Sequence, residues 1–326
     1  MKIAIHSNQF DGRGTGRTPY DYGIFLQKYL NADVVYVTSM HANNGGLNQI
    51  SQKFQSFLYD AISPYDIKKA IETIVNSEKV DFIHMYKAGE NDNITPENCK
   101  SGIHCVFRMA QPHGNVYAGV SEYLAKKFNK TEFIPHIIQR SLQTEDYRAK
   151  YNIPKDAFVV GRHGGNYQFD IPFVKEAIVN SLQSRKDLYF LFLSTEKFIE
   201  HERVIFIPWV ENHNDVNNFI HACDCMLHAR GDGETFGLAV GEFSAANKPI
   251  ITWSGLWRGT PFYAYEKSHL EILGDSAIIY DDQYTLSDIL TKLDRSYVLS
   301  RDWDKYSKTF SPQNVIDIYS KTFLSL

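Results

Sequence analysis

The stretch His228-Ala-Arg-Gly-Asp-Gly-Glu-Thr-Phe-Gly-Leu-Ala-Val-Gly-Glu242 is the most informative part of this chain. It follows the apolar run Cys225-Met-Leu and reads as the end of a strand, a glycine-rich loop and a helix from about Gly237 to Ala246. Asn247 and Pro249 end this helix, because asparagine tolerates the left-handed cap and proline cannot continue a helix.

Loop glycines ahead of a helix leave its first backbone N–H groups unpaired, and the positive end of the helix dipole favours an anion such as a diphosphate there. Gly237 has no Cβ that would keep a phosphate away. On one continuous helix Glu234 and Glu242 would point about 80° apart, which suits a shared metal ion poorly. We therefore expect Glu234 in the loop, at one end of a ligand. Glu242 would lie on the helix and accept hydrogen bonds from hydroxyls at the other end.

The same stretch resembles the signature of the family 4 glycosyltransferases of GT-B fold. Two glutamates, the Phe236-Gly237 pair and the segment Lys248-Pro-Ile-Ile251 all stand at the offsets of that family. The resemblance implies that Glu242 holds the ribose hydroxyls of a nucleotide sugar and Glu234 a sugar hydroxyl. It also implies that the amides from Phe236 to Leu238 bind the diphosphate. The alternative is a solvated helix with two ordinary surface glutamates.

Length and composition set the limits. A chain of 326 residues with 43% apolar side chains suits two α/β domains with real cores. The 34 Lys and Arg are outnumbered by 38 Asp and Glu, which argues against a nucleic-acid surface. No run of ~18 apolar residues is present, so we expect a cytoplasmic protein without a membrane span, with peripheral membrane contact left open. Cys99, Cys105, Cys223 and Cys225 lack zinc-site spacing and read as buried thiols.

The N-terminal half alternates strands with helices, which predicts a parallel, doubly wound sheet. Expected strands are residues 2–6, 33–38, 80–85, 104–109 and 133–136, and expected helices are 19–30, 49–59 and 65–77. Pro19 suits a first helical turn. The loop before that helix contains Gly12-x-Gly14-x-Gly16, which lacks dinucleotide-binding spacing. By resemblance this loop faces the cleft between domains, with Arg13, Thr15 and Arg17 as candidates, or it is a solvated turn.

His113 lies on the loop after the strand 104–109. The following segment, Val116 to Glu122, resembles the part of the family in which a strand ends at a serine and a helix begins. A histidine there could polarise the acceptor or support the departing phosphate, because its pKa lies near physiological pH. It could equally be a structural turn residue. Lys87, at the end of the strand 80–85, could reach the cleft or be an ordinary exposed lysine.

A second α/β pattern begins near residue 157, after a polar boundary stretch at 138–155. Expected strands are residues 157–162, 188–193, 204–208 and 277–280, and expected helices are 171–183, 217–222, 285–298 and the tail from 303. The family usually has an arginine and then a lysine that grip the diphosphate. Arg162 matches, but no lysine precedes Lys175, so Arg230, Lys87 or Arg13 would have to complete the neutralisation.

Asp302-Trp-Asp304 has the D-x-D form with which GT-A transferases hold a divalent ion. Those enzymes place it after an apolar strand, whereas here Leu299-Ser-Arg301 precedes it. Acidic residues at a helix start are expected from the dipole alone. We therefore expect no metal and no other cofactor.

These observations predict two Rossmann-like parallel-sheet domains that face a cleft. We expect an acceptor domain at 1–145, a donor domain at 146–305 and a final helix at 306–326 that crosses back to the first domain. The expected activity is a retaining, metal-independent hexosyl-type transfer from a nucleotide-diphosphate sugar to an acceptor hydroxyl. Alternatives are an epimerase or phosphorylase of the same fold, or a non-catalytic binding module. The predicted catalytic residues are Glu234, His113 and Arg162, and the predicted donor-binding residues are Glu242, Thr235, Phe236, Gly237, Leu238, Arg230, Gly14 and Thr15.

Overall fold

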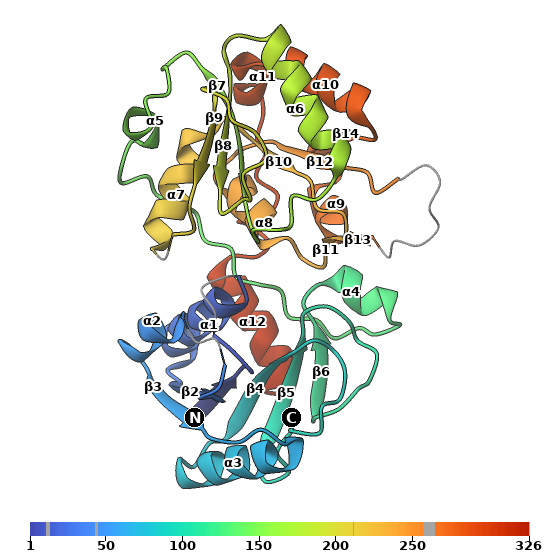
Figure 1. The fold of residues 1–326 in the computed structure, drawn as a ribbon. Coiled ribbons are helices and arrows are strands. Elements are labelled where there is room, and N and C mark those ends of the chain that lie inside the picture. Colours follow the sequence, from blue (N-terminus) through green and yellow to red (C-terminus); the bar gives the residue numbers. More distant parts are fainter. Residues whose placement is uncertain (11–13, 43–44, 211, 257–264, 326) are drawn as a thin grey trace. The chain divides into compact units, whose positions relative to one another are not determined.

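The computed structural model describes residues 1–10, 14–42, 45–210, 212–256 and 265–325, with the backbone alone at 14–16. The chain forms two compact units (Figure 1). Unit 1 comprises Met1–Ile137 and Phe310–Leu326, and unit 2 comprises Ile138–Thr309. The domain limits predicted from the sequence, residues 145 and 305, stay predictions.

The described part of unit 1 contains a six-stranded sheet in the order β3-β2-β1-β4-β5-β6. Its strands are β1 (Lys2–His6), β2 (Asp33–Ser39), β3 (Gln55–Tyr59), β4 (Phe82–Lys87), β5 (Lys100–Cys105) and β6 (Val116–Gly119). Its helices are α1 (Gly14–Leu30), α2 (Leu47–Ser51), α3 (Pro64–Ser77), α4 (Glu122–Lys127) and α12 (Pro312–Phe323). Helix α12, from the end of the chain, packs beside α1 (Figure 1), where the Tyr22 and Tyr319 rings are 5.6 Å apart.

The described part of unit 2 contains a second six-stranded sheet, in the order β14-β12-β10-β7-β8-β9, and a two-stranded ladder of β11 and β13. The strands are β7 (Phe158–His163), β8 (Leu188–Leu193), β9 (Val204–Ile207), β10 (Cys225–His228), β11 (Gly233–Glu234), β12 (Ile250–Trp253), β13 (Glu266–Lys267) and β14 (Ala277–Tyr280). The helices are α5 (Tyr147–Lys150), α6 (Pro172–Ser184), α7 (His213–Ala222), α8 (Leu238–Ala245), α9 (Ser268–Leu273), η1 (Gly274–Ser276), α10 (Gln283–Lys292) and α11 (Arg295–Leu299). Helices α6 and α10 lie side by side on one face of the sheet, and α7 covers the other (Figure 1).

Both six-stranded sheets are parallel in every strand pair, and both follow the same winding. The first strand of each unit, β1 or β7, pairs on one side with the second strand in sequence, β2 or β8, and on the other side with the fourth, β4 or β10. This arrangement confirms the expected doubly wound α/β architecture. Ligands of such sheets bind at the carboxyl ends of the strands where the winding reverses. In unit 2 we therefore expect a ligand site at the carboxyl ends of β7 and β10.

Several local expectations were wrong. Residues 49–59 form the end of the short α2 and then the edge strand β3, because residues 55–59 pair with β2. Such tertiary pairing overrides the helical spacing of apolar residues. Helix α1 begins at Gly14, so Pro19 lies inside the helix and not in its first turn. Residues 133–136 form an isolated bridge at Phe133 in place of a strand. The expected helix 285–298 breaks into α10 and α11, because Asp294 caps the second helix.

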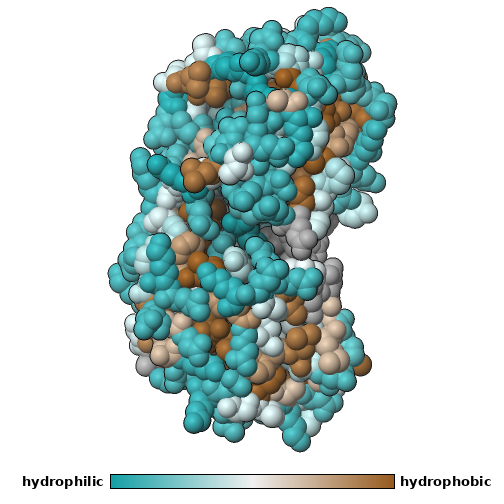
Figure 2. Space-filling view, turned by 90° about the vertical axis from the view of Figure 1, so that its left-hand side faces the viewer, coloured by the Kyte–Doolittle hydropathy of each residue, from teal (hydrophilic) through white to brown (hydrophobic). Residues whose placement is uncertain are grey.

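The surface of the face shown in Figure 2 is mainly hydrophilic, with smaller apolar areas. Exposed apolar side chains come from separate parts of the chain, such as Ile62, Leu142 and Tyr284. Among the described residues, none of the helices combines the length and the hydrophobicity that a membrane crossing requires.

Asp224 holds the pairing of β7 with β10 in unit 2. Its carboxylate accepts hydrogen bonds from the Val159 amide at 2.7 Å, from Arg148 at 2.8 Å and from Arg295 at 3.1 Å. Burial alone would raise the pKa of Asp224, but the hydrogen bonds and charges of the two arginines and the amide lower it. Gly161 on β7 faces the same place, where an added Cβ would collide with the Cys223 sulfur.

The Asp224→Asn variant tests this network. Neutralising the carboxylate leaves Arg148 and Arg295 without their anion, so the free energy of unfolding should fall by about 2 kcal/mol. Urea unfolding followed by tryptophan fluorescence measures the change. The matched control is Asp288→Asn, whose exposed partner is Lys292, and it should change stability by less than about 0.5 kcal/mol. Equal effects of the two variants would contradict the role given to Asp224.

Unit 1 contains a buried group of histidines and tyrosines. The His84 Nε2 and His104 Nδ1 atoms are 3.1 Å apart, and the His84 ring stacks on Tyr86 at 4.5 Å. Burial lowers the pKa of His84 and His136 to about 3 and that of His104 well below its usual value. These side chains are therefore neutral in the folded protein.

The stability of unit 1 should consequently fall as the pH drops below about 6.5, the ordinary histidine pKa. Below this pH the histidines bind protons in the unfolded chain but stay neutral in the folded protein. Each histidine therefore lowers the free energy of unfolding by about 1.4 kcal/mol per pH unit, down to its pKa in the folded protein. Hydrogen exchange of the β4 amides at pH 7 and pH 5 measures this. The His84→Gln variant removes one such group, so its loss of stability over this range should be about 2 kcal/mol smaller. Identical pH dependence in variant and wild type would refute the proposal.

Candidate functional site

The winding reversal in unit 2 brings two strand ends together. Strand β7 ends with Arg162 and His163, and β10, its neighbour in the sheet, ends with His228. The loop after β10 carries Glu234 in the short strand β11, and α8 carries Glu242. The structure thus brings both glutamates of the sequence motif to the edge where such a sheet binds ligands.

Glu234 is held by two partners. Its Oε1 lies 3.2 Å from His228 Nε2, and its Oε2 accepts a hydrogen bond from Arg230 at 3.0 Å. Burial alone would raise the pKa of Glu234, but the hydrogen bond to His228 and the charge of Arg230 lower it to about 2. Glu234 is therefore a carboxylate at neutral pH and acts only as a hydrogen-bond acceptor.

Glu242 has histidines as neighbours. Its Oε2 lies 3.0 Å from His163 Nε2, and its Oε1 lies 3.9 Å from His213 Nε2 at the start of α7. The His163 ring stacks on Phe243 with centroids 5.7 Å apart. Sequence reasoning missed both histidines, although His163 directly follows Arg162.

The turn into α8 has the geometry expected of an anion-accepting helix start. Gly237 is the N-cap, with φ of 84° in the left-handed region that favours glycine. Phe236 before it is buried, packs edge-on against the Tyr306 ring and accepts a hydrogen bond from the Tyr306 hydroxyl at 2.9 Å. Thr235 and Leu238 flank this turn and are partly exposed. The predicted donor-binding residues from 235 to 238 therefore form one anchored turn.

Arg162 is buried and makes three hydrogen bonds to neighbouring loops of unit 2. Its guanidinium donates to the Thr195 hydroxyl at 2.6 Å and to the carbonyls of Ser194 and Gly165 at 3.1 and 2.8 Å. Burial lowers its pKa to about 10, although the charge of Glu234 opposes this, so it stays cationic at neutral pH. Arg162 thereby ties together the loops after β7 and β8. Its predicted contact with a diphosphate stays a prediction.

The three candidates for the missing cation have different surroundings. Lys87 belongs to unit 1, is buried and pairs with Asp92. Arg13 lies outside the described residues. Arg230 belongs to unit 2, follows β10, and its Nε is buried without a partner among the described residues. Within unit 2, Arg230 is the candidate that lies beside Glu234.

The remaining predicted residues belong to unit 1. His113 precedes β6, its Nδ1 lies 2.7 Å from the Gln111 carbonyl, and its ring lies 5.4 Å from that of Tyr117. Burial lowers the pKa of His113. Gly14 begins α1, and the side chain of Thr15 lies outside the described part of the chain. The roles predicted for these residues stay predictions.

Asp302 and Asp304 are engaged in local capping. Asp302 accepts from the Asp304 amide at 3.0 Å, and Asp304 accepts from the Ser307 amide at 2.9 Å and from Arg140. In the part of the chain that the structure describes, no group of three or more His, Cys, Asp or Glu is placed to hold a metal ion.

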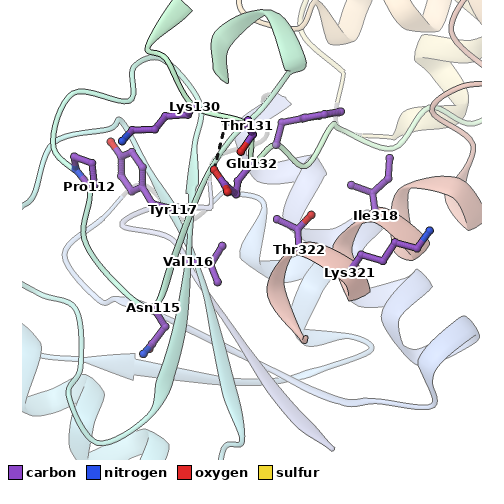
Figure 3. Close-up of a pocket in the computed structure, with 11 residues that line it drawn as sticks. Pro112, Asn115, Val116, Tyr117, Lys130, Thr131, Glu132, Ile318, Lys321 and Thr322 are labelled. Carbon is purple, nitrogen blue, oxygen red and sulfur yellow. Dashed lines mark hydrogen bonds between the residues drawn. The ribbon is translucent and has the colours of Figure 1, made fainter. Parts of the chain in front are cut away.

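Unit 1 also contains an open cavity of about 690 Å³ (Figure 3). It lies between the start of β6, the segment 130–133 and the last turns of α12, with Tyr117, Glu132 and Thr322 among its lining residues. None of the predicted site residues lines it. It runs along the edge strand β6, from Asn115 and Val116 at the start of the strand to the segment 130–133, which lies beside its last residue, Gly119.

No family model matches the sequence, and a comparison with curated proteins finds no match either. Similarity appears among solved structures. HepE from Anabaena, solved with UDP and glucose, superposes with a TM-score of 0.76 at 14% identity, covering 100% of both chains. A glycosyltransferase from Rickettsia africae gives 0.68 at 13% identity, covering 99% of this chain and 94% of that one.

A putative UDP-N-acetylglucosamine 2-epimerase from Listeria monocytogenes is also similar, with a TM-score of 0.64 at 12% identity, covering 100% of this chain and 98% of that one. The similar structures therefore include one described as a glycosyltransferase and one described as a putative epimerase. What they share with this chain is the fold, and this confirms the expected GT-B class.

Proposed function

We propose that this protein is a glycosyltransferase that moves a sugar from a nucleotide-diphosphate donor to an acceptor hydroxyl. The observation that carries the proposal is the gathering of Glu234, Glu242 and Arg230 around the start of α8, at the strand ends where the sheet of unit 2 reverses its winding. HepE, which shares the fold, has been solved with UDP, with UDP and glucose, and with UDP-glucose. We therefore assign the donor to unit 2 and the acceptor to unit 1.

Each part of the donor has a partner of suitable chemistry. Glu242 accepts hydrogen bonds from the ribose hydroxyls, and Glu234 accepts one from a sugar hydroxyl. The first amides of α8 and the Arg230 guanidinium face the diphosphate, because a helix start and an arginine both stabilise phosphate oxygens. Arg162 contributes a buried positive charge and keeps the adjoining loops in place.

These groups also account for the chemical step. Cleavage of the bond between the anomeric carbon and the diphosphate leaves negative charge on the leaving group, and preformed N–H donors stabilise that charge as it develops. We propose that the transfer is retaining and metal-independent, with the first amides of α8 and the Arg230 guanidinium stabilising the departing diphosphate.

One alternative has a specific observation in its favour, since a protein described as a putative epimerase is among those of similar fold. The test is to incubate the protein with UDP-glucose, first alone and then with a panel of hydroxyl acceptors. A transferase releases UDP in an acceptor-dependent way. An epimerised sugar in the absence of acceptor favours the epimerase, and donor binding without any turnover favours a non-catalytic binding module.

The Glu242→Gln variant tests the nucleotide assignment. Loss of the charged acceptor weakens the hydrogen bonds to ribose, so the affinities for UDP and for UDP-glucose should both fall about tenfold in calorimetry. Glu271→Gln, an exposed glutamate of α9 in the same unit, is the control and should bind both ligands like the wild type. Unchanged UDP affinity in Glu242→Gln would show that this glutamate does not hold the nucleotide.

The Glu234→Gln variant tests the sugar assignment and should behave differently. It removes the acceptor for a sugar hydroxyl while the nucleotide contacts remain, so the preference for UDP-glucose over UDP should fall about tenfold. UDP itself should bind at least as tightly as before, because Arg230 loses a competing carboxylate. Glu200→Gln, on an exposed loop of unit 2, serves as control. A parallel loss of affinity for both ligands would argue against a sugar contact.

A further inference from the structure

A line of buried polar groups continues behind Glu234. His228 Nδ1 lies 2.9 Å from the Thr252 hydroxyl, and that hydroxyl lies 3.1 Å from His269 Nε2. The same His269 nitrogen lies 3.4 Å from the hydroxyl of Tyr265. His228 and Thr252 are register partners in the parallel strands β10 and β12, so the backbone fixes their separation.

The carboxylate at one end of this line determines which nitrogen of His228 carries the hydrogen. Glu234 is ionised and can only accept, so the His228 Nε2 atom that faces it at 3.2 Å must carry the hydrogen. In neutral His228 the other nitrogen, Nδ1, then has only a lone pair. It can be satisfied only by a donor, and the Thr252 hydroxyl is the group that faces it.

Tyr265, at the opposite end of the line, independently determines which nitrogen of His269 carries the hydrogen. The Tyr265 hydroxyl has a single hydrogen, which it donates to the Trp253 carbonyl at 2.8 Å. Towards His269 Nε2 it can therefore only accept, so this nitrogen must also carry a hydrogen. The single hydrogen on His269 Nε2 is shared between the Tyr265 hydroxyl and the nearer Thr252 hydroxyl, which leaves the threonine hydrogen to point at His228.

The two ends thus agree on one direction of hydrogen bonding, from His269 through Thr252 to His228 and on to Glu234. A doubly protonated His228 would break this order. Its Nδ1–H would point at the Thr252 oxygen, which has two lone pairs and could accept from both histidines, but the threonine hydrogen would then lose His228 as its acceptor. Buried donors without acceptors are disfavoured, so the network selects neutral His228 with its proton on Nε2.

We propose that Thr252 and His269 are positioning residues that hold His228 in the Nε2–H form and thereby aim the Glu234 carboxylate at a sugar hydroxyl. The inference rests on the proposed function for the identity of the ligand and on the hydrogen-bond network alone for the form of His228. With His228 on Oε1 and Arg230 on Oε2, both oxygens of Glu234 are fixed, and each keeps acceptor capacity for a hydroxyl.

The first experiment reads the proton positions directly in the unliganded full chain. Long-range ¹H–¹⁵N spectra of the ¹⁵N-labelled protein at neutral pH distinguish the two neutral tautomers and the imidazolium, and the His228→Gln and His269→Gln spectra assign the two signals. We expect both histidines as the Nε2–H tautomer. His228 found as the Nδ1–H tautomer or as imidazolium in the wild type overturns the proposal, and this measurement requires no stability in a Thr252 variant.

The second experiment compares Thr252→Val, which keeps the shape but removes the hydroxyl, with Thr252→Ser, which keeps the hydroxyl. In Thr252→Val the His228 signal should change its tautomer pattern, and the preference for UDP-glucose over UDP should fall about tenfold, with UDP affinity within twofold of the wild type. Thr252→Ser should restore both readouts. A wild-type tautomer pattern in Thr252→Val, or an unchanged preference, contradicts the positioning role.

The two proposals fail in different ways. If the wild type binds neither UDP nor UDP-glucose, the proposed function is wrong, while the tautomer of His228 still tests the network. If both ligands bind and Thr252→Val discriminates between them like the wild type, the donor assignment stands and the positioning role is wrong.

Discussion

The pairing of β7 with β10 is the contact on which the site in unit 2 depends. These strands are far apart in the sequence, yet Val160 lies in register with Cys225 and Gly161 with Met226. The approach is close enough that Gly161 leaves room for the Cys223 side chain. Asp224 then anchors the start of β10 to the Val159 amide. Because both strands run in the same direction, this one pairing places their carboxyl ends, and the side chains that follow, next to each other.

The site that results combines charges that would be costly to bury singly. Glu234 is largely withdrawn from water, and its ionised form persists because His228 and Arg230 contact its two oxygens. A buried charge is tolerated only when it is paired and hydrogen-bonded. Arg162, which is more deeply buried, meets the same requirement through the carbonyls and the hydroxyl of neighbouring loops. The site therefore holds its charged groups in place before any ligand arrives.

Much of this architecture could be predicted from the sequence, and the reasons are local. The strands of unit 2 are short apolar runs bounded by loops, and the motif around Glu234 and Glu242 has fixed spacing. The edge strand β3 could not be predicted, because its identity depends on pairing with β2. The histidines beside Glu242 were missed for a similar reason. His163 and Glu242 are widely separated in the sequence, as are His228 and Thr252, and only the fold brings each pair together.

The two glutamates of the motif have the same side chain but different hydrogen-bonding surroundings. Glu234 belongs to a hydrogen-bonded line whose two ends each allow a single proton placement, so its surroundings form a fixed acceptor. Glu242 lies on α8, where its two oxygens are 3.0 Å from His163 Nε2 and 3.9 Å from His213 Nε2. A rigid acceptor suits selection among sugar hydroxyls, where discrimination comes from leaving the wrong partner unpaired. The difference between the glutamates thus follows from which strand end each one meets, and not from the motif itself.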